Sequence, residues 1–168
     1  MATIRRARPE DARGIHETHM RSIREICAPD YSVEELNAWG GRAFNEEQRL
    51  RGIADEFVWV VEEGGKIHGH GHLALEEKEG RRVAYVRSLY FTPEVKGKGH
   101  GQELMKLMLA EAKNAGAIKM TLESSLTSLE FYFKLGFRPT GPEMRYPVAG
   151  VGVRCVPMEL KIGQESSG

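Results

Sequence analysis

The chain has 168 residues, 40% of them hydrophobic, a length that suits one compact domain with a buried core rather than two ordinary domains. Its 24 basic and 24 acidic residues cancel to a formal net charge of zero, which argues against electrostatic capture by nucleic acid or by an anionic membrane. There is no signal-peptide-like start and no apolar run of roughly 18 residues, and Cys27 and Cys155 lie outside any CxxC spacing, so a cytoplasmic protein with reduced thiols is expected.

The first third of the chain predicts one strand and two helices. A weak alternation of apolar residues indicates a strand over residues 2–7. Acidic residues after a proline then open a helix that is expected over residues 9–26. Ser32 and Glu35 have the spacing of a capping box, which predicts a second helix over residues 33–39.

The rest of the chain predicts five strands and two helices. A two-glycine hairpin turn at residues 64–65 joins the first two of these strands. Leucine, methionine and alanine at steps of four predict a helix between the glycine-rich loop and Gly116. The strands are expected over residues 57–61, 67–75, 83–91, 118–122 and 156–162, and a short helix over residues 128–135. This order indicates an α+β fold with one βαβ crossover at the glycine-rich loop.

The segment from Phe91 to Gly101 carries the strongest functional signal. Three alternating glycines stand between a strand and a helix, where backbone N–H groups and the positive end of the helix dipole can hold a phosphate. The spacing is not that of a Walker loop, and Gln102 stands where a dinucleotide-binding loop requires glycine. The segment is therefore either a different phosphate-binding loop or only a tight turn.

Two segments resemble the signatures of the GCN5-related N-acetyltransferase (GNAT) superfamily. Lys96-Gly-Lys-Gly99-His-Gly101 resembles its acyl-CoA-binding loop, in which Gln or Arg usually stands first; lysine keeps the charge but lacks the planar fork of arginine. The stretch from Ser125 to Phe137, which contains Phe131-Tyr132 and Gly136-Phe137, resembles the family's second segment. Both occur in the family's order, and the resemblance covers nearly all of residues 2–162.

The resemblance implies the fold and the donor. It implies a mixed, mostly antiparallel twisted sheet of six to seven strands flanked by about four helices, with the acyl-CoA site at a splay between central strands. It implies one domain over residues 2–162, a flexible tail over residues 163–168, and acetyl-CoA as co-substrate without a metal. A homodimer is compatible with the family. The cofactor contacts that it implies are Leu89, Tyr90, Phe91, Lys96, Gly97, Lys98, Gly99, His100, Gly101, Gln102, Ser125 and Ser128.

Tyr132 is the residue that the resemblance places near the sulfur of coenzyme A. A phenol held there can protonate the departing thiolate as a general acid. The alternative is that Tyr132 is an aromatic core residue beside Phe131 and Phe137. Ser125 also has two possible roles, because its hydroxyl either contacts the cofactor arm or caps the next helix.

The general base and the acceptor are less well defined by the sequence. Arg87 stands near the place where many relatives have a glutamate on the fourth strand, so it either holds a substrate anion or is a solvated strand charge. His68, His70 and His72 alternate on one strand and are either buried polar residues, a source of a water-relayed base, or part of a metal site. Among them His70 is the candidate for contact with the acceptor substrate. Their spacing is too splayed for three easy ligands to one ion.

Tyr31 and Trp39 complete the candidates, since the segment around them resembles the second helix of a bacterial GNAT subgroup. In that subgroup the helix lines the acceptor site, although Trp39 can equally anchor the helix on the sheet. The sequence thus predicts an acetyl-CoA-dependent N-acetyltransferase that acts on an unidentified primary amine by direct attack. The alternative is a catalytically inactive CoA-binding regulatory domain.

Overall fold

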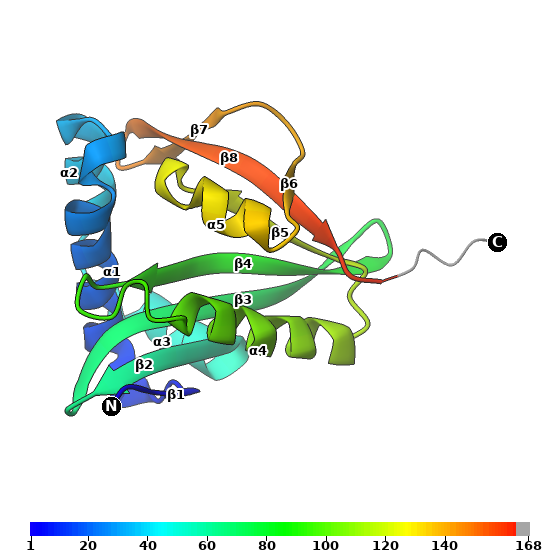
Figure 1. Ribbon diagram of the computed structural model, residues 1–168, viewed down its shortest axis with the longest axis horizontal. Coiled ribbons are helices and arrows are strands. Elements are labelled where there is room, and N and C mark those ends of the chain that lie inside the picture. The colour runs from blue at the N-terminus through cyan, green and yellow to red at the C-terminus, as the bar shows by residue number, and fades with distance from the viewer. Residues whose placement is uncertain (164–168) are drawn as a thin grey trace.

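The computed structural model describes residues 1–163 and forms an α+β fold around one sheet (Figure 1). The predicted flexible tail therefore lies, apart from Gly163, outside the described residues. The strands are β1 Thr3–Arg6, β2 Phe57–Glu63, β3 Lys66–Lys78, β4 Arg81–Phe91, β5 Lys119–Ser124, β6 Arg138–Pro139, β7 Met144–Val148 and β8 Val151–Lys161. The helices are α1 Ala12–Ile26, α2 Val33–Gly40, α3 Glu46–Asp55, α4 His100–Asn114 and α5 Leu129–Lys134, with short 3-10 turns η1 Pro9–Asp11, η2 Ala28–Asp30 and η3 Leu126–Ser128.

The predicted fold class is confirmed, with three elements more than the sequence analysis found: α3, β7 and the two-residue strand β6. The sheet runs β1-β2-β3-β4-β5-β8-β6 with β7 added to β8, and among the strands of residues 1–163 only β4 and β5 pair in parallel. Helix α3 was not predicted because Gly52 is its one buried residue within the described chain, so it has almost no apolar face. Strand β7 was not predicted because most of its residues are exposed, which removes the alternation that marks a half-buried strand.

The predicted splay between central strands lies between β4 and β5. The two strands pair only from Val83 to Tyr85 on β4, opposite Lys119 to Thr121 on β5. Beyond Tyr85, β4 continues to Phe91 with only its β3 edge paired, while β5 stays with β8. In Figure 1 the two parts of the sheet diverge toward α1 and α2. The open edge of β4 therefore faces a gap that side chains and loops must line.

The helices cover both faces of the sheet, and β3 shows which helix covers which face. A Cβ placed on Gly71 would lie 2.7 Å from Met108 of α4. The neighbouring His72 contacts Gly52 of α3, and His70 lies against His19 of α1. Because successive residues of a strand face opposite sides, α4 covers one face and α1 and α3 cover the other. The largest buried cluster, which includes Leu104 and Phe137, forms on the α4 side.

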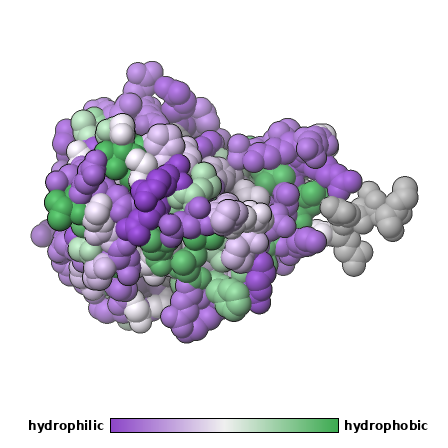
Figure 2. Space-filling model, turned by 90° about the horizontal axis from the view of Figure 1, so that it is seen from above, coloured by the Kyte–Doolittle hydropathy of each residue, from purple (hydrophilic) through white to green (hydrophobic). Residues whose placement is uncertain are grey.

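The described surface is mainly polar. On the face seen in Figure 2 hydrophilic side chains predominate and hydrophobic ones form separate patches. None of the helices within residues 1–163 is long and apolar enough to cross a membrane.

Candidate active site

A groove of about 560 Å³ runs along the open edge of β4 and over the start of α4; we call it the loop groove. Its walls come from the strand end, the glycine-rich loop and the first turns of α4 and α5. Eleven of the residues singled out in the sequence line it, namely Leu89, Tyr90, Phe91, Lys96, Gly97, Gly99, His100, Gly101, Gln102, Ser128 and Tyr132. Lys98 is exposed and does not line the groove, and Ser125 lies in the neighbouring space described below.

The glycine-rich loop has the geometry of an anion cradle at the N-terminus of α4. Gly99 is the N-cap residue with φ +87°, a left-handed conformation that favours glycine. Within residues 1–163, the N–H groups of Gly97, Lys98 and Gly99 donate to no backbone carbonyl, and the first N–H groups of a helix have no intrahelical partner. The buried Nδ1 of His100 also has no hydrogen-bond partner within residues 1–163. Several converging donors are thus available to a phosphate group.

Tyr132 is both a packed aromatic residue and a wall of the groove. Its ring centroid lies 5.1 Å from that of Phe131 and 5.4 Å from that of Phe137, and the residue is 6% exposed. Among the described residues its hydroxyl makes no hydrogen bond. Burial raises the pKa of Tyr132 above its usual value, so the phenol keeps its proton at neutral pH.

A second cavity of about 250 Å³, which we call the side pocket, opens on the other side of Tyr90. Aromatic rings from four elements line it together with arginines and one glutamate. A small space of about 20 Å³, which we call the junction, connects the two cavities. The junction shares Tyr132 and Leu89 with the loop groove and Glu123 and Ser125 with the side pocket, and Tyr90 lines all three. The junction is therefore where a donor in the groove and an acceptor in the pocket would meet.

Three of the predicted residues have specific structural partners here. The Tyr31 hydroxyl donates to the Arg154 carbonyl and accepts from the Leu126 N–H, both at 2.8 Å, so only its ring is available to the side pocket. The Trp39 ring lies 5.1 Å from that ring and also lines the pocket, so Trp39 both anchors α2 and shapes the wall. The Ser125 hydroxyl accepts from the Ser128 N–H at 3.2 Å, which makes it a helix cap at the edge of the junction.

Arg87 and the histidines have partners that the sequence did not reveal. Arg87 lines the side pocket, but its guanidinium donates to both carboxylate oxygens of Glu56, at 2.9 and 3.1 Å. His72 contacts the same carboxylate at 2.7 Å. His70 is fully buried, contacts Ser88 Oγ at 2.9 Å and lines none of the three cavities, so an acceptor does not reach it. These pairings depend on α3, which carries Glu56 at its end.

Two further residues of the side pocket were missed in the sequence. Glu123 lies at the junction, and its carboxylate accepts from the Tyr85 hydroxyl at 2.8 Å. Arg42 follows α2, and its Nε donates to the Trp39 carbonyl at 2.8 Å. Neither belongs to a motif. The only sequence signal was position, because Glu123 stands two residues before Ser125 and Arg42 three residues after Trp39.

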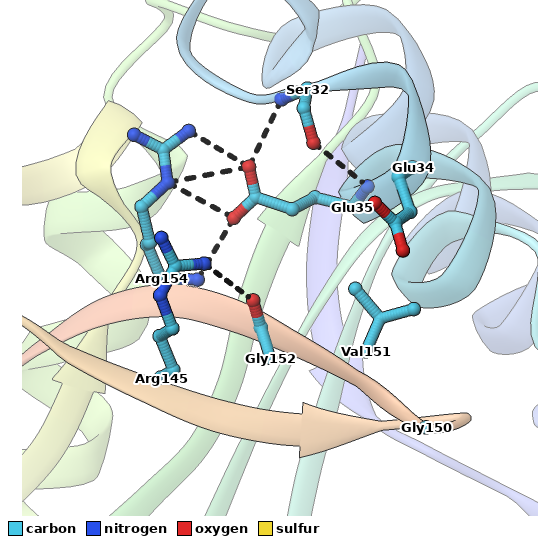
Figure 3. Close-up of a pocket in the computed structure, with 8 residues that line it drawn as sticks. All are labelled: Ser32, Glu34, Glu35, Arg145, Gly150, Val151, Gly152 and Arg154. Atoms are coloured by element: carbon cyan, nitrogen blue, oxygen red, sulfur yellow. Dashed lines mark hydrogen bonds and ion pairs between the residues drawn. The ribbon is translucent and has the colours of Figure 1, made fainter.

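One buried ion pair fixes α2 against β8 and so holds the outer wall of the side pocket. Glu35, in the predicted capping box, accepts from the Arg154 guanidinium at 2.8 Å, from the Arg154 N–H at 3.0 Å and from the Ser32 N–H at 3.0 Å (Figure 3). The hydrogen bonds from Arg154 lower the pKa of Glu35 to about 2. The carboxylate is therefore charged in the folded chain down to strongly acidic pH.

We expect this ion pair to make stability fall in acid. The Glu35 pKa is lower in the folded chain, at about 2, than its ordinary value of 4.5, so protons bind preferentially to the unfolded chain. The contribution is complete above pH 4.5 and is lost as the pH falls toward 2. Urea unfolding at pH 7 and pH 3 should show a smaller loss between the two pH values for Glu35→Gln than for the parent protein. Glu34→Gln, at the exposed neighbouring position, should behave like the parent; equal losses in all three proteins would refute the assignment.

The sequence model of the family described as "Acetyltransferase (GNAT) domain" matches residues 27–162. The chain is also similar to the glucosamine 6-phosphate N-acetyltransferase of Trypanosoma brucei brucei. The two sequences are 33% identical over 101 residues, which are 58% of this chain and 68% of that protein.

Solved structures share the fold. The GCN5-related N-acetyltransferase from Rhodopseudomonas palustris superposes with a TM-score of 0.84 at 22% identity and covers 96% of each chain. The PaiA N-acetyltransferase from Thermoplasma acidophilum, solved in complex with coenzyme A, superposes with a TM-score of 0.75 at 22% identity over 96% of this chain and 99% of that one. At 22% sequence identity, the likeness to these two structures shows the fold alone.

Proposed function

The chain belongs to the GNAT acetyltransferase family, and on that premise we propose that it binds acetyl-CoA in the loop groove and acetylates a small primary amine held in the side pocket. The observation that carries the proposal is the junction. It joins a groove that has an anion cradle at one end to a pocket of amino-acid size, and Tyr132 stands between them.

The loop groove supplies the contacts that a coenzyme A molecule needs. The free N–H groups at Gly97 to Gly99 and the start of α4 suit its pyrophosphate, and Lys96 adds a positive charge beside them. The open edge of β4 from Leu89 to Phe91 offers unpaired main-chain groups for the pantetheine arm and for the oxygen that becomes negative during transfer. These roles are proposals that rest on the geometry of the groove.

Tyr132 is the proposed general acid. When the amine attacks the thioester carbon, the C–S bond breaks and a thiolate leaves, and the buried phenol of Tyr132 donates its proton to that sulfur. The raised pKa ensures that the phenol carries the proton before the step. Packing on Phe131 and Phe137 fixes the ring, so the hydroxyl is held in one place.

The acceptor is proposed to be a small molecule. The side pocket is smaller than the ~300–1,000 Å³ of common ligand sites, and aromatic rings enclose it on several sides. The relative from Trypanosoma brucei brucei is named for a small acceptor, glucosamine 6-phosphate, which agrees with this size.

The alternative is a regulatory domain that binds CoA without catalysis, and the arginine at position 87 favours it because the family often has a carboxylate there. A thiol-release assay with acetyl-CoA over a panel of amines, with calorimetry of CoA binding, separates the two functions. Turnover with any amine supports the enzyme. Micromolar binding of CoA with no turnover on the whole panel supports the regulatory domain, and no binding at millimolar CoA overturns both.

We expect Gly99→Ala to weaken CoA binding. A side chain at φ +87° costs about 1–2 kcal/mol in backbone strain and shifts the N–H groups of the cradle, so the Kd for CoA should rise by roughly tenfold. Gly80→Ala is the matched control, since Gly80 has φ +74° in the β3–β4 turn, far along the chain from the cradle. The two variants should lose similar thermal stability, but only Gly99→Ala should lose affinity in calorimetry. An equal Kd in both would show that the loop does not bind the cofactor.

A further inference from the structure

Two arginines beside the side pocket carry positive charge that the described chain does not neutralise. Neither Arg42 nor Arg49 takes part in an ion pair among residues 1–163. Burial lowers the pKa of both, and repulsion from Arg42 contributes to lowering that of Arg49 to about 10. Two neighbouring guanidinium groups without a carboxylate favour the binding of an anion.

The two histidines that contact Arg49 are neutral, because their pKa values are lowered, chiefly by burial. The Nη2 atom of Arg49 lies 3.2 Å from Nδ1 of His16 and 3.2 Å from Nδ1 of His19, contacts in which each imidazole accepts. Burial holds the pKa of His19 well below its usual value. The His19 ring stacks on Tyr90 at 4.3 Å and lines the side pocket together with Arg42. This wall of the pocket is therefore positive and lacks an internal counter-charge.

Glu123 brings a negative charge to the junction, where Arg87 also lies but is paired with Glu56. The Glu123 carboxylate accepts a hydrogen bond from the Tyr85 hydroxyl, a neutral group, at 2.8 Å. The other carboxylates near the pocket are engaged by arginines, Glu35 by Arg154 and Glu56 by Arg87. Glu123 is thus the carboxylate in this region that can accept a proton or hold an ammonium group, and it lies next to Tyr132 in the lining of the junction.

We propose that the side pocket selects a small primary amine that also bears one anionic group, a carboxylate or a phosphate, with the anion on Arg42 and the amine on Glu123. The inference rests on the proposed function and names its class of acceptor. Arg42 and Glu123 both line the side pocket, and of the two only Glu123 also lines the junction. Opposite charges placed in this way orient such a molecule, because the reversed orientation would place like charges together.

This orientation places the amine nitrogen at the junction, where it can attack the thioester carbon. The bound ammonium first loses a proton to solvent to give the free amine. As the new N–C bond forms and the C–S bond breaks, Glu123 takes the second proton from nitrogen while Tyr132 gives its proton to sulfur. Glu123 then passes its proton to Tyr132 through solvent, so that both groups return to their starting states. The products are the N-acetyl compound, free CoA thiol and one released proton.

The test compares acceptors that differ only in the anion. An apolar L-amino acid is assayed against its α-amide, and O-phosphoethanolamine against ethanolamine, by thiol release from acetyl-CoA. We expect kcat/KM to be at least tenfold higher for the anionic member of one pair, and that pair identifies carboxylate or phosphate as the anionic group that the pocket recognises.

Arg42→Gln should raise KM for that member by about 10–100-fold and abolish the preference. Arg51→Gln, an exposed arginine on α3 paired with Glu47, should retain it. Glu123→Gln should lower kcat/KM by about 100-fold for both members with the Kd for acetyl-CoA unchanged.

Binding provides a readout that does not depend on turnover. Calorimetry of the preferred anionic amine with the CoA-loaded protein should show binding to the parent protein and to Arg51→Gln but not to Arg42→Gln. If none of the amines is acetylated, all four are titrated in the same way. Equal kcat/KM within both pairs, or an Arg42→Gln variant that keeps the preference or the binding, overturns the inference while the N-acetyltransferase function stands. Absence of CoA binding overturns the proposed function, and the titrations of the amines alone then decide the inference.

Discussion

Replacing Tyr132 by phenylalanine should reduce kcat by about 10²–10⁴-fold, the range that one general acid supplies, while the Kd for acetyl-CoA stays the same. The substitution removes only the hydroxyl, which has no hydrogen-bond partner among the described residues, and leaves the ring packed on Phe131 and Phe137. Steady-state thiol release gives kcat and calorimetry gives the Kd.

Two controls make the Tyr132 result specific. The melting temperature of Tyr132→Phe should equal that of the parent, because no packing is lost. A thioester donor whose thiol is more acidic needs less help from a proton donor, so the variant should lose less activity with it than with acetyl-CoA. A kcat that matches the parent with acetyl-CoA would exclude Tyr132 as the general acid without affecting the fold.

The second large effect is expected at Phe137, where alanine should lower the free energy of unfolding by about 3–5 kcal/mol. The Phe137 side chain is fully buried, belongs to the main core cluster and packs edge-on against Tyr132 at 5.4 Å. Its removal leaves a cavity under the tyrosine ring. Urea unfolding followed by circular dichroism measures the change.

Phe133 offers a matched control in the same segment. It is 53% exposed, and its ring lies 4.0 Å from the Arg138 guanidinium. Phe133→Ala therefore removes a surface contact worth about 0.5–1 kcal/mol and leaves the core intact. If the two alanine variants lost equal stability, the placement of Phe137 in the core would be wrong.

The elements that the sequence predicted correctly are those whose signals are local. Serine and glutamate three residues apart define the capping box at Ser32, and the structure forms both of its hydrogen bonds. The helix after the glycine-rich loop is predicted well because buried residues repeat along it, among them Leu104 and Met108. In each case one short stretch contains the residues that mark the element, although distant residues such as Arg154 also stabilise it.

The missed elements are stabilised by distant residues. Helix α3 is held through side chains that reach other elements, Arg49 to the histidines of α1 and Glu56, just after the helix, to Arg87 on β4. Strand β7 is exposed and is defined by its pairing with β8. Neither produces a hydrophobic period, and the local signal of α3, Asn45 as N-cap before two glutamates, was missed in the sequence analysis.

The sequence by itself predicted the fold class and a loop whose geometry suits an anion. The loop could be predicted because a strand, three glycines and a helix start are contiguous, and backbone geometry at such a turn is a local property. Only the tertiary structure decided the acceptor side. Arg87 is predicted either to hold a substrate anion or to be a solvated strand charge, but it is paired with Glu56. Arg42 and Glu123 belong to no motif, and both line the side pocket. Whether a charged side chain has an ion-pair partner depends on which side chains the fold brings together from separate elements. These contacts join residues far apart in the sequence, so no single segment determines them.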